Sequence, residues 1–347
     1  MSSARLPNEQ LPPRTEAEVP ALKALLGQAA FSVGNTTYGW DNVVLAAELS
    51  GDWARLRDTV REGIACLRRM DQEEEDSLEA EEIETAANEF RYARDLVSAE
   101  EMEAWLGRWG LTAEGWMDYI RSSLLRQKWS GQLADCVAEY SPSEQEVDER
   151  IATEAVCSGT LGQWARALAG RAAIHASDKE RPEGAEPANA QEKLAGLEAS
   201  FRRFRERTLT PEAVRAKIRS SRTDWTRLDC QRVSFPEEGM AREAALCVRE
   251  DGRALAEVAG DADREIASEQ VYLEDLEPGI RADFFGAKKG ALLGPVKRED
   301  DFVLYLVLDK VLPSEEDAAT IARAEEAILQ SIVAREIDDR VKWHSRL

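Results

Sequence analysis

Residues 282–313 constrain the fold of this chain more than any other stretch. Residues 302–308 (FVLYLVL) are apolar throughout and rich in residue types that favour β-strands. Gly294-Pro295-Val296 opens an extended segment before them, and Glu299-Asp300-Asp301 supplies a polar turn. A short apolar run bounded by turn signals is typical of a strand that is covered on both faces. The stretch therefore predicts a β-hairpin whose second strand is buried.

The residues just before this hairpin predict the rest of a small domain. Residues 225–235 alternate like a strand, and residues 239–259 have helical periodicity with a break at Asp251-Gly252. Residues 270–273 form a short extended piece, and a helical turn carries Phe284 and Phe285. Strand, helix, short strand, helix and hairpin in this order predict an α+β domain on a small, antiparallel-rich sheet.

The N-terminal two thirds predict a set of amphipathic helices. Residues 31–38 first form two short extended pieces around Gly34-Asn35. Helix starts are then marked by capping residues, which are Ser98 with Glu101, Thr112, Ser143 with Glu146, and Thr210 before Pro211. Five aromatic residues (Trp105, Trp109, Trp116, Tyr119 and Trp129) lie at roughly helical spacing. They are either an exposed binding surface or core, and the amphipathic pattern favours core.

Charge and composition exclude several classes of partner. The 347 residues carry a formal net charge of −22, which disfavours nucleic acid and anionic membrane surfaces as partners. The acidic run at residues 71–84 is either a docking face for basic peptides or a solvated helix end, and the second interpretation is favoured. The sequence shows neither a signal peptide nor about 18 consecutive apolar residues, so we expect a cytoplasmic protein. The five cysteines have no CxxC spacing and are expected to be free thiols.

The predicted hairpin has the order Gly-Pro-Val, turn, apolar strand, Asp-Lys-Val. This pattern resembles the last hairpin of parvulin-type peptidyl-prolyl isomerase domains. The helices of residues 90–129 resemble the helical module of the SurA-like and PpiC-like chaperones, and the C-terminal helix resembles the segment that returns to that module. The most similar subgroup is that of PpiC-related proteins associated with the maturation of ribosomally synthesised peptides. The resemblance implies a SurA-like helical module and a truncated parvulin-like domain.

The sequence departs from this family at the residues that carry its chemistry. Parvulins hold two histidines that face each other across the sheet, and these positions fall here at or next to Arg232 and at Val303. The only histidines are His175 and His344, which cannot supply that pair. The family's Gly-Gly-Asp-Leu-Gly-Trp signature is also missing. We therefore predict a non-catalytic domain, with an isomerase that uses Cys230 or Tyr272 as the alternative.

Other chemistries find no support in the sequence. Two distant histidines and unpaired cysteines make a poor zinc site, and a catalytic triad would have to use His175 or His344. Gly286-Ala287-Lys288-Lys289-Gly290 lacks the spacing of a phosphate-binding loop. No metal and no cofactor are predicted.

These observations predict a domain plan and a function. The plan is a disordered N-terminus (1–20), a helical module (21–221) with a linker at 177–189, the parvulin-like domain (222–313) and a returning C-terminal helix (314–347). The function is to hold a precursor peptide, or another unfolded peptide segment, for peptide-modifying enzymes. The alternatives are an active isomerase and an assembly scaffold that binds proteins through its tryptophan-rich helices; the oligomeric state is left open, a dimer included. The resemblance implies a peptide-binding site that comprises Arg232, Tyr272, Phe284, Phe285, Leu293 and Phe302.

Overall fold

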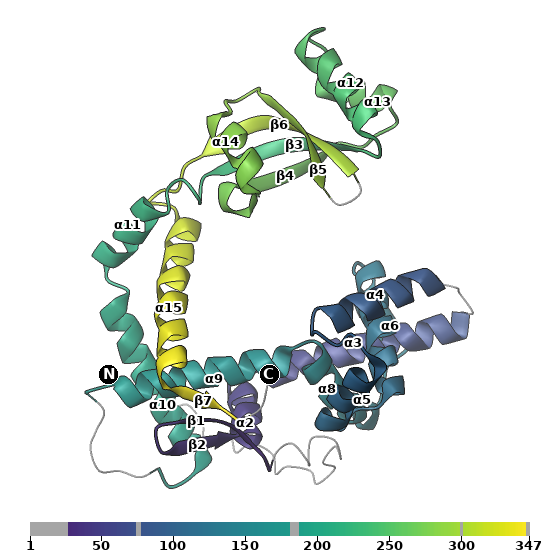
Figure 1. Cartoon of the computed structure of the whole chain (residues 1–347). Helices are drawn as coiled ribbons and strands as arrows, with labels where there is room; N and C mark the ends of the chain where they lie inside the picture. Colours follow the sequence, from purple (N-terminus) through teal and green to yellow (C-terminus); the bar gives the residue numbers. More distant parts are fainter. Residues whose placement is uncertain (1–26, 74–77, 181–186, 299–300, 345–347) are drawn as a thin grey trace, which may run out of the picture. The chain divides into compact units, whose positions relative to one another are not determined.

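The computed structural model describes residues 27–73, 78–180, 187–298 and 301–344, so the predicted disorder of residues 1–20 lies outside the described part of the chain. Helices dominate, and the strands form two small antiparallel sheets, which confirms the predicted α+β class (Figure 1). The chain divides into two compact units. We call Met1–Phe204 with Val333–Leu347 the helical unit, and Arg205–Ile332 the sheet unit.

The helical unit contains nearly all of the predicted amphipathic helices. Its elements are β1 (Ala29–Val33), β2 (Thr36–Gly39), α2 (Trp40–Ser50), α3 (Asp52–Glu73), α4 (Ala80–Tyr92), α5 (Ala99–Trp109), α6 (Ala113–Lys128), α7 (Leu133–Glu139), α8 (Glu144–Cys157), α9 (Thr160–Ser177), most of α10 (Ala190–Thr208) and β7 (Val341–Trp343).

The predicted helix caps are confirmed at atomic level. Ser98 and Ser143 each form a capping box with the glutamate three residues later. Thr112 accepts from the Gly115 amide, and Thr210 accepts from the Ala213 amide with proline at the first helical position. These side chains satisfy amide groups that have no partner within the helix, which is why local sequence predicts them well.

The C-terminal segment differs from the single long helix expected for residues 314–347. α15 (Ala318–Arg340) ends at Arg340, and residues 341–343 form β7, which pairs antiparallel with β1. β1 also pairs with β2 around Gly34, as predicted, so the sheet order is β2-β1-β7. Phe31 stacks on Tyr38 and contacts Trp343, and this packing stabilises an extended backbone at residues 341–343.

The tryptophan-rich helices put their aromatic residues into the core, as the amphipathic pattern favours. Trp109 and Trp129 are buried, while Trp105, Trp116 and Tyr119 are partly buried and pack around Phe90. The acidic run forms the exposed end of α3 and the exposed start of α4 where it is described. Within the described residues it is therefore a solvated helix end.

The sheet unit contains the predicted hairpin of residues 282–313. Its elements are α11 (Pro211–Ser220), β3 (Arg227–Phe235), α12 (Glu238–Arg249), α13 (Leu255–Asp261), β4 (Ala267–Tyr272), the 3-10 turn η1 (Leu273–Asp275), α14 (Pro278–Gly286), β5 (Leu292–Arg298), β6 (Asp301–Val311) and the first part of α15. The four strands are antiparallel in the order β4-β3-β6-β5 (Figure 1).

Both faces of this sheet are covered, as the apolar run predicted. On one face, Val303, Tyr305 and Val307 pack with Phe284 and Ala287, and we call it the α14 face. On the other, Leu304 packs with residues of α12 and α13, and we call it the α12 face. Successive side chains of a strand point to opposite faces, so β6 can serve both cores only if it is apolar at consecutive positions. Among the described residues, none of the helices is both long and apolar enough to cross a membrane.

Candidate functional site

A hollow of about 510 Å³ lies on the α14 face of the sheet. Its lining residues are Arg232, Ser234, Arg298, Asp301 and Val303. Ser234 pairs with Val303 and Arg232 pairs with Tyr305 in the β3–β6 register. Directly opposed residues of an antiparallel pair share a face, so the hollow contains both positions that the parvulin resemblance singled out, Arg232 and Val303.

A row of polar side chains crosses the sheet beside this hollow, with one residue from each strand. The row consists of Glu269 (β4), Arg232 (β3), Tyr305 (β6) and Arg298 (β5). Arg232 Nε lies 3.2 Å from Glu269 Oε2, and Arg298 Nη1 donates to Glu269 Oε1. Two guanidinium groups thus lie against one carboxylate. Arg298 forms a hydrogen bond to Oε1, and Arg232 forms an ion pair with Oε2, which accepts no hydrogen bond from the described residues.

The electrostatics of the row favour hydrogen-bond donation over proton transfer. The hydrogen bond to Glu269 raises the pKa of Arg298, so its guanidinium stays protonated. Burial raises the pKa of the Tyr305 phenol, and the nearby Glu269 charge acts in the same direction. Neither group changes its protonation state near neutral pH. The hollow can therefore offer guanidinium N–H and hydroxyl donors to a carbonyl or carboxylate, beside the apolar Val303.

The two histidines lie in the helical unit and not on the sheet that carries Arg232 and Val303. His175 Nδ1 is 2.8 Å from Ser200 Oγ, and His344 Nε2 is 3.1 Å from Ser32 Oγ. The described residues also contain no group of three or more His, Cys, Asp or Glu side chains that could hold a metal ion.

The six residues predicted for the peptide site do not converge on one pocket. Phe284 is 1% exposed and packs edge-on against Tyr305, so it belongs to the core. Phe285 is 48% exposed, and Lys310 Nζ lies 4.7 Å from the centre of its ring. Tyr272 lies under the guanidinium of Arg323, away from the hollow in the β3–β4 register.

The remaining two residues lie on opposite faces of the sheet. Leu293 is opposite Tyr305 and packs against the α14 face, whereas Phe302 packs against the α12 face. Of the predicted set, only Arg232 lines the hollow. Strand alternation around Arg232 and Val303 could have found Ser234 and Tyr305, but Arg298 and Glu269 reach the site through strand register, which local sequence does not reveal.

The two edges of the sheet differ in how they are covered. At the β5 edge, Arg249 Nη2 donates to the carbonyl oxygens of Leu292 at 3.0 Å and Gly294 at 2.9 Å. Gly294 has φ +100°, and a Cβ there would lie 2.5 Å from the Val303 carbonyl oxygen, so this close strand contact requires glycine. At the other edge, β4 pairs only with β3 within the described residues, and Ser268 and Gln270 are exposed. The β4 edge is the more accessible one.

No family model matches the sequence, and no curated protein matches it. Solved structures do match. One is the foldase protein PrsA from Streptococcus pneumoniae, at 13% identity, covering 90% of this chain and 88% of that one with a TM-score of 0.26. Another is a SurA-like chaperone of Campylobacter jejuni, at 9% identity, covering 92% of this chain and all of that one with a TM-score of 0.19. Scores this low do not establish a shared fold, so the architecture described above rests on this chain's own elements.

Proposed function

We propose that this chain is a non-catalytic peptide-binding protein of the chaperone type, which binds an extended peptide segment at the sheet unit. Its clients would be precursor peptides that it holds for modifying enzymes. The observation that carries the proposal is the combination of an uncovered edge strand, β4, with a donor-rich hollow beside it that contains no imidazole.

Strand addition explains how such a site would bind many sequences. An extended peptide gains main-chain hydrogen bonds from an open edge, and alternate side chains enter neighbouring slots. Arg232 pairs with Ala267 and Glu269 contacts Arg232, so the hollow adjoins the first half of β4. A peptide beside β4 would then place a carbonyl or carboxylate within reach of the two arginines.

The runner-up function, isomerisation by groups other than histidine, has weak chemical support. Cys230 is 1% exposed, and burial raises the pKa of its thiol to about 11, so it is neither accessible nor ionised near neutral pH. Tyr272 lies beneath Arg323. The assembly-scaffold alternative is also weakly supported. It needs an exposed tryptophan surface, but Trp105, Trp116 and Trp129 pack into cores of the helical unit.

Binding to the full-length chain tests the proposal. The probe is a labelled, unstructured ten-residue peptide that contains proline and lysine, and fluorescence anisotropy gives its dissociation constant. We expect Arg232→Gln to weaken binding about ten-fold or more, since a hydrogen bond to a charged group is worth about 1.5–3 kcal/mol. Arg202→Gln is the matched control, because Arg202 is exposed on α10 of the helical unit. Equal binding by both variants would contradict the proposed site.

A proline-isomerisation assay separates the proposal from its runner-up. Cis–trans exchange of a model Xaa-Pro peptide should be no faster with the protein than without it. A titratable acceleration would contradict the proposal and favour an active isomerase instead.

A further inference from the structure

One end of the hollow on the α14 face carries more positive than negative charge among the described residues. Arg232 and Arg298 both lie against Glu269, so two guanidinium groups face a single carboxylate. Asp301, the acidic residue of the lining, is four residues along β6 from Tyr305, the partner of Arg232. At about 3.4 Å per residue, Asp301 lies at the far end of the hollow. One positive charge beside Arg232 is therefore not balanced locally, although the whole chain carries a net charge of −22.

Arg232 also has hydrogen-bond donors to offer. Its ion pair with Glu269 runs through Nε, 3.2 Å from Oε2, and that oxygen is buried and accepts no hydrogen bond from the described residues. The Arg232 side chain is 39% exposed and lines the hollow together with Ser234. The two Nη groups of an arginine form a planar fork that fits the two oxygens of a carboxylate.

The first residue of β4 leaves this guanidinium accessible from a neighbouring strand. Ala267 pairs with Arg232, and β3 continues past that pair to Phe235. Ala267 is exposed, and its side chain is a single methyl group. In a strand added to β4, the residue opposite Ala267 would share the α14 face with it. Because neighbouring strands are about 4.8 Å apart, the Cα of that residue would be about 10 Å from the Arg232 Cα, which a glutamate and an arginine side chain span together.

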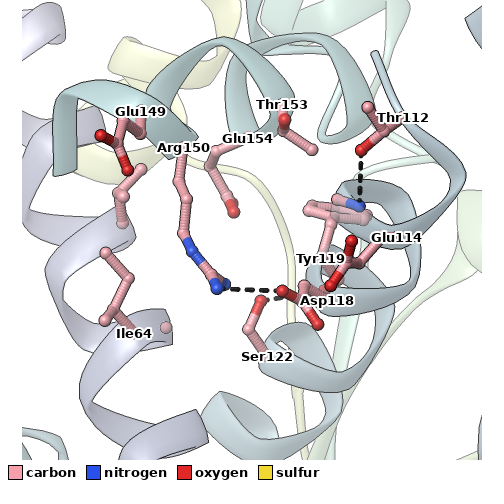
Figure 2. A pocket seen from close by; sticks show the side chains of 13 residues that line it. Ile64, Thr112, Glu114, Asp118, Tyr119, Ser122, Glu149, Arg150, Thr153 and Glu154 are labelled. Carbon is pink, nitrogen blue, oxygen red and sulfur yellow. Dashed lines mark hydrogen bonds and ion pairs between the residues drawn. The ribbon is translucent and has the colours of Figure 1, made fainter. Parts of the chain in front are cut away.

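A second hollow, in the helical unit, contains an arginine with the opposite surroundings. This hollow of about 270 Å³ lies between α3, α6 and α8 (Figure 2). Its Arg150 shares the lining with four carboxylates, which belong to Glu114, Asp118, Glu149 and Glu154. Arg150 is 42% exposed and lies 2.9 Å from Asp118. It therefore matches Arg232 in residue type and exposure but stands among an excess of negative charge, which makes it a control position.

We propose that the hollow on the α14 face binds the side-chain carboxylate of a glutamate in the peptide that adds to β4. The carboxylate would accept hydrogen bonds from the Nη groups of Arg232, with the Ser234 hydroxyl as a further donor, and the methylene stem would lie on Ala267. The single charge of a carboxylate matches the single unbalanced charge beside Arg232. This preference rests on the proposed function, because it requires a peptide strand beside β4.

Peptide affinities of the full-length chain, measured by fluorescence anisotropy, test the preference. The probe is a labelled ten-residue peptide that contains proline and lysine, is capped at both ends and has one central glutamate; the comparison peptide has glutamine there. We expect the glutamate peptide to bind about ten-fold more tightly or better, because hydrogen bonds to charged groups are stronger than those between neutral groups. The glutamine peptide with a free C-terminal carboxylate should bind no more tightly than its capped form, because the hollow takes a side chain and not a chain end.

Matched variants locate the preference. Arg232→Gln should reduce the affinity ratio of the two capped peptides to about two-fold or less, because no charged donor remains opposite the glutamate. Arg232→Lys keeps the charge but loses the planar fork, so it should give an intermediate ratio. Arg150→Gln should keep the full ratio, because Arg150 lies in the helical unit. Each variant is judged by a ratio of two affinities, so a general weakening of peptide binding does not imitate the effect.

Equal binding of the glutamate and glutamine peptides would overturn the preference while leaving peptide binding at the sheet intact. The preference is also overturned if Arg232→Gln keeps the full ratio, or if a free C-terminal carboxylate gives the same gain as the glutamate. If neither peptide binds, the proposed function fails and the preference fails with it.

Discussion

Arginine at position 232 and valine at position 303 define what the hollow of the sheet can do. An imidazole pair can gain and lose protons near neutral pH, whereas a guanidinium keeps its proton and valine has none. Arg232 also forms an ion pair with Glu269 of the neighbouring strand, with 3.2 Å between Nε and Oε2. With these two residues in place, the hollow can donate hydrogen bonds but cannot exchange protons near neutral pH.

Neighbouring phenylalanines on α14 should respond differently to truncation. Phe284→Ala should lower the free energy of unfolding by about 3–5 kcal/mol, because it empties a buried core position. Phe285→Ala should cost less than about 1 kcal/mol, chiefly the lost contact with Lys310. Urea denaturation checks both values.

Peptide affinity gives Phe285 a second test. If the exposed ring is a binding anchor, Phe285→Ala should weaken peptide binding by about 1–3 kcal/mol without a comparable loss of stability. A collapse of the thermal midpoint in this variant would show that Phe285 belongs to the core.

Cysteine reactivity should follow burial. Cys66, Cys136, Cys157 and Cys230 are buried, and Cys247 is partly exposed. Burial raises the pKa of the Cys66 and Cys157 thiols to about 12, so near neutral pH they stay protonated and unreactive. A thiol reagent should modify Cys247 first in the folded protein and all five cysteines after denaturation. Fewer than five reactive thiols in denaturant without reductant would indicate a disulfide.

At the scale of elements, the sequence predicts what depends on local contacts and misses what depends on register. Ser98, Thr112, Ser143 and Thr210 were predictable because a capping side chain bonds an amide three residues away. The strand at residues 341–343 was not, because its partner β1 lies about 300 residues earlier. The contact of Arg249 with the β5 edge was not predictable either, because Arg249 lies in α12, 43 residues before its partner Leu292.

The packing of α15 on α9 can be tested at Gly170. A Cβ at this glycine would lie 2.6 Å from Val333 Cγ1, so the two helices meet closely. Gly170→Ala should destabilise the protein by about 1–3 kcal/mol through overpacking. Adding Val333→Ala should recover part of that loss, and chemical denaturation of the single and double variants measures the coupling. Strict additivity of the two changes would contradict the contact.

Asp178 links α9 to α10 and should make stability depend on acid. Burial raises the pKa of this carboxyl, but hydrogen bonds from Arg203, Ser200 and the Glu180 amide outweigh it and lower the pKa from 3.8 to about 2. The folded state therefore gains stability above about pH 4, which is lost as the pH falls towards 2. The stability difference between the unmodified chain and Asp178→Asn should shrink over that interval, as thermal midpoints will show. A constant difference would contradict the assignment.

At the scale of the whole molecule, the net charge indicates the kind of partner but not the place where it binds. The net charge of −22 favours faster association with basic peptides at low salt, but it says nothing about where they bind. The sequence predicted the α+β class and the buried hairpin. It placed five of six site residues outside the hollow, because it identified apolar side chains without revealing which face of the sheet they share.

Hydrogen exchange of the full-length chain, with and without the ten-residue probe peptide, tests the central claim most directly. If the peptide adds a strand to the open edge, amide exchange in β4 (residues 267–272) should slow, while β5 (residues 292–298), whose edge Arg249 covers, should change little. Unchanged exchange in β4 at saturating peptide, or slowing confined to the helical unit, would contradict peptide binding at the sheet.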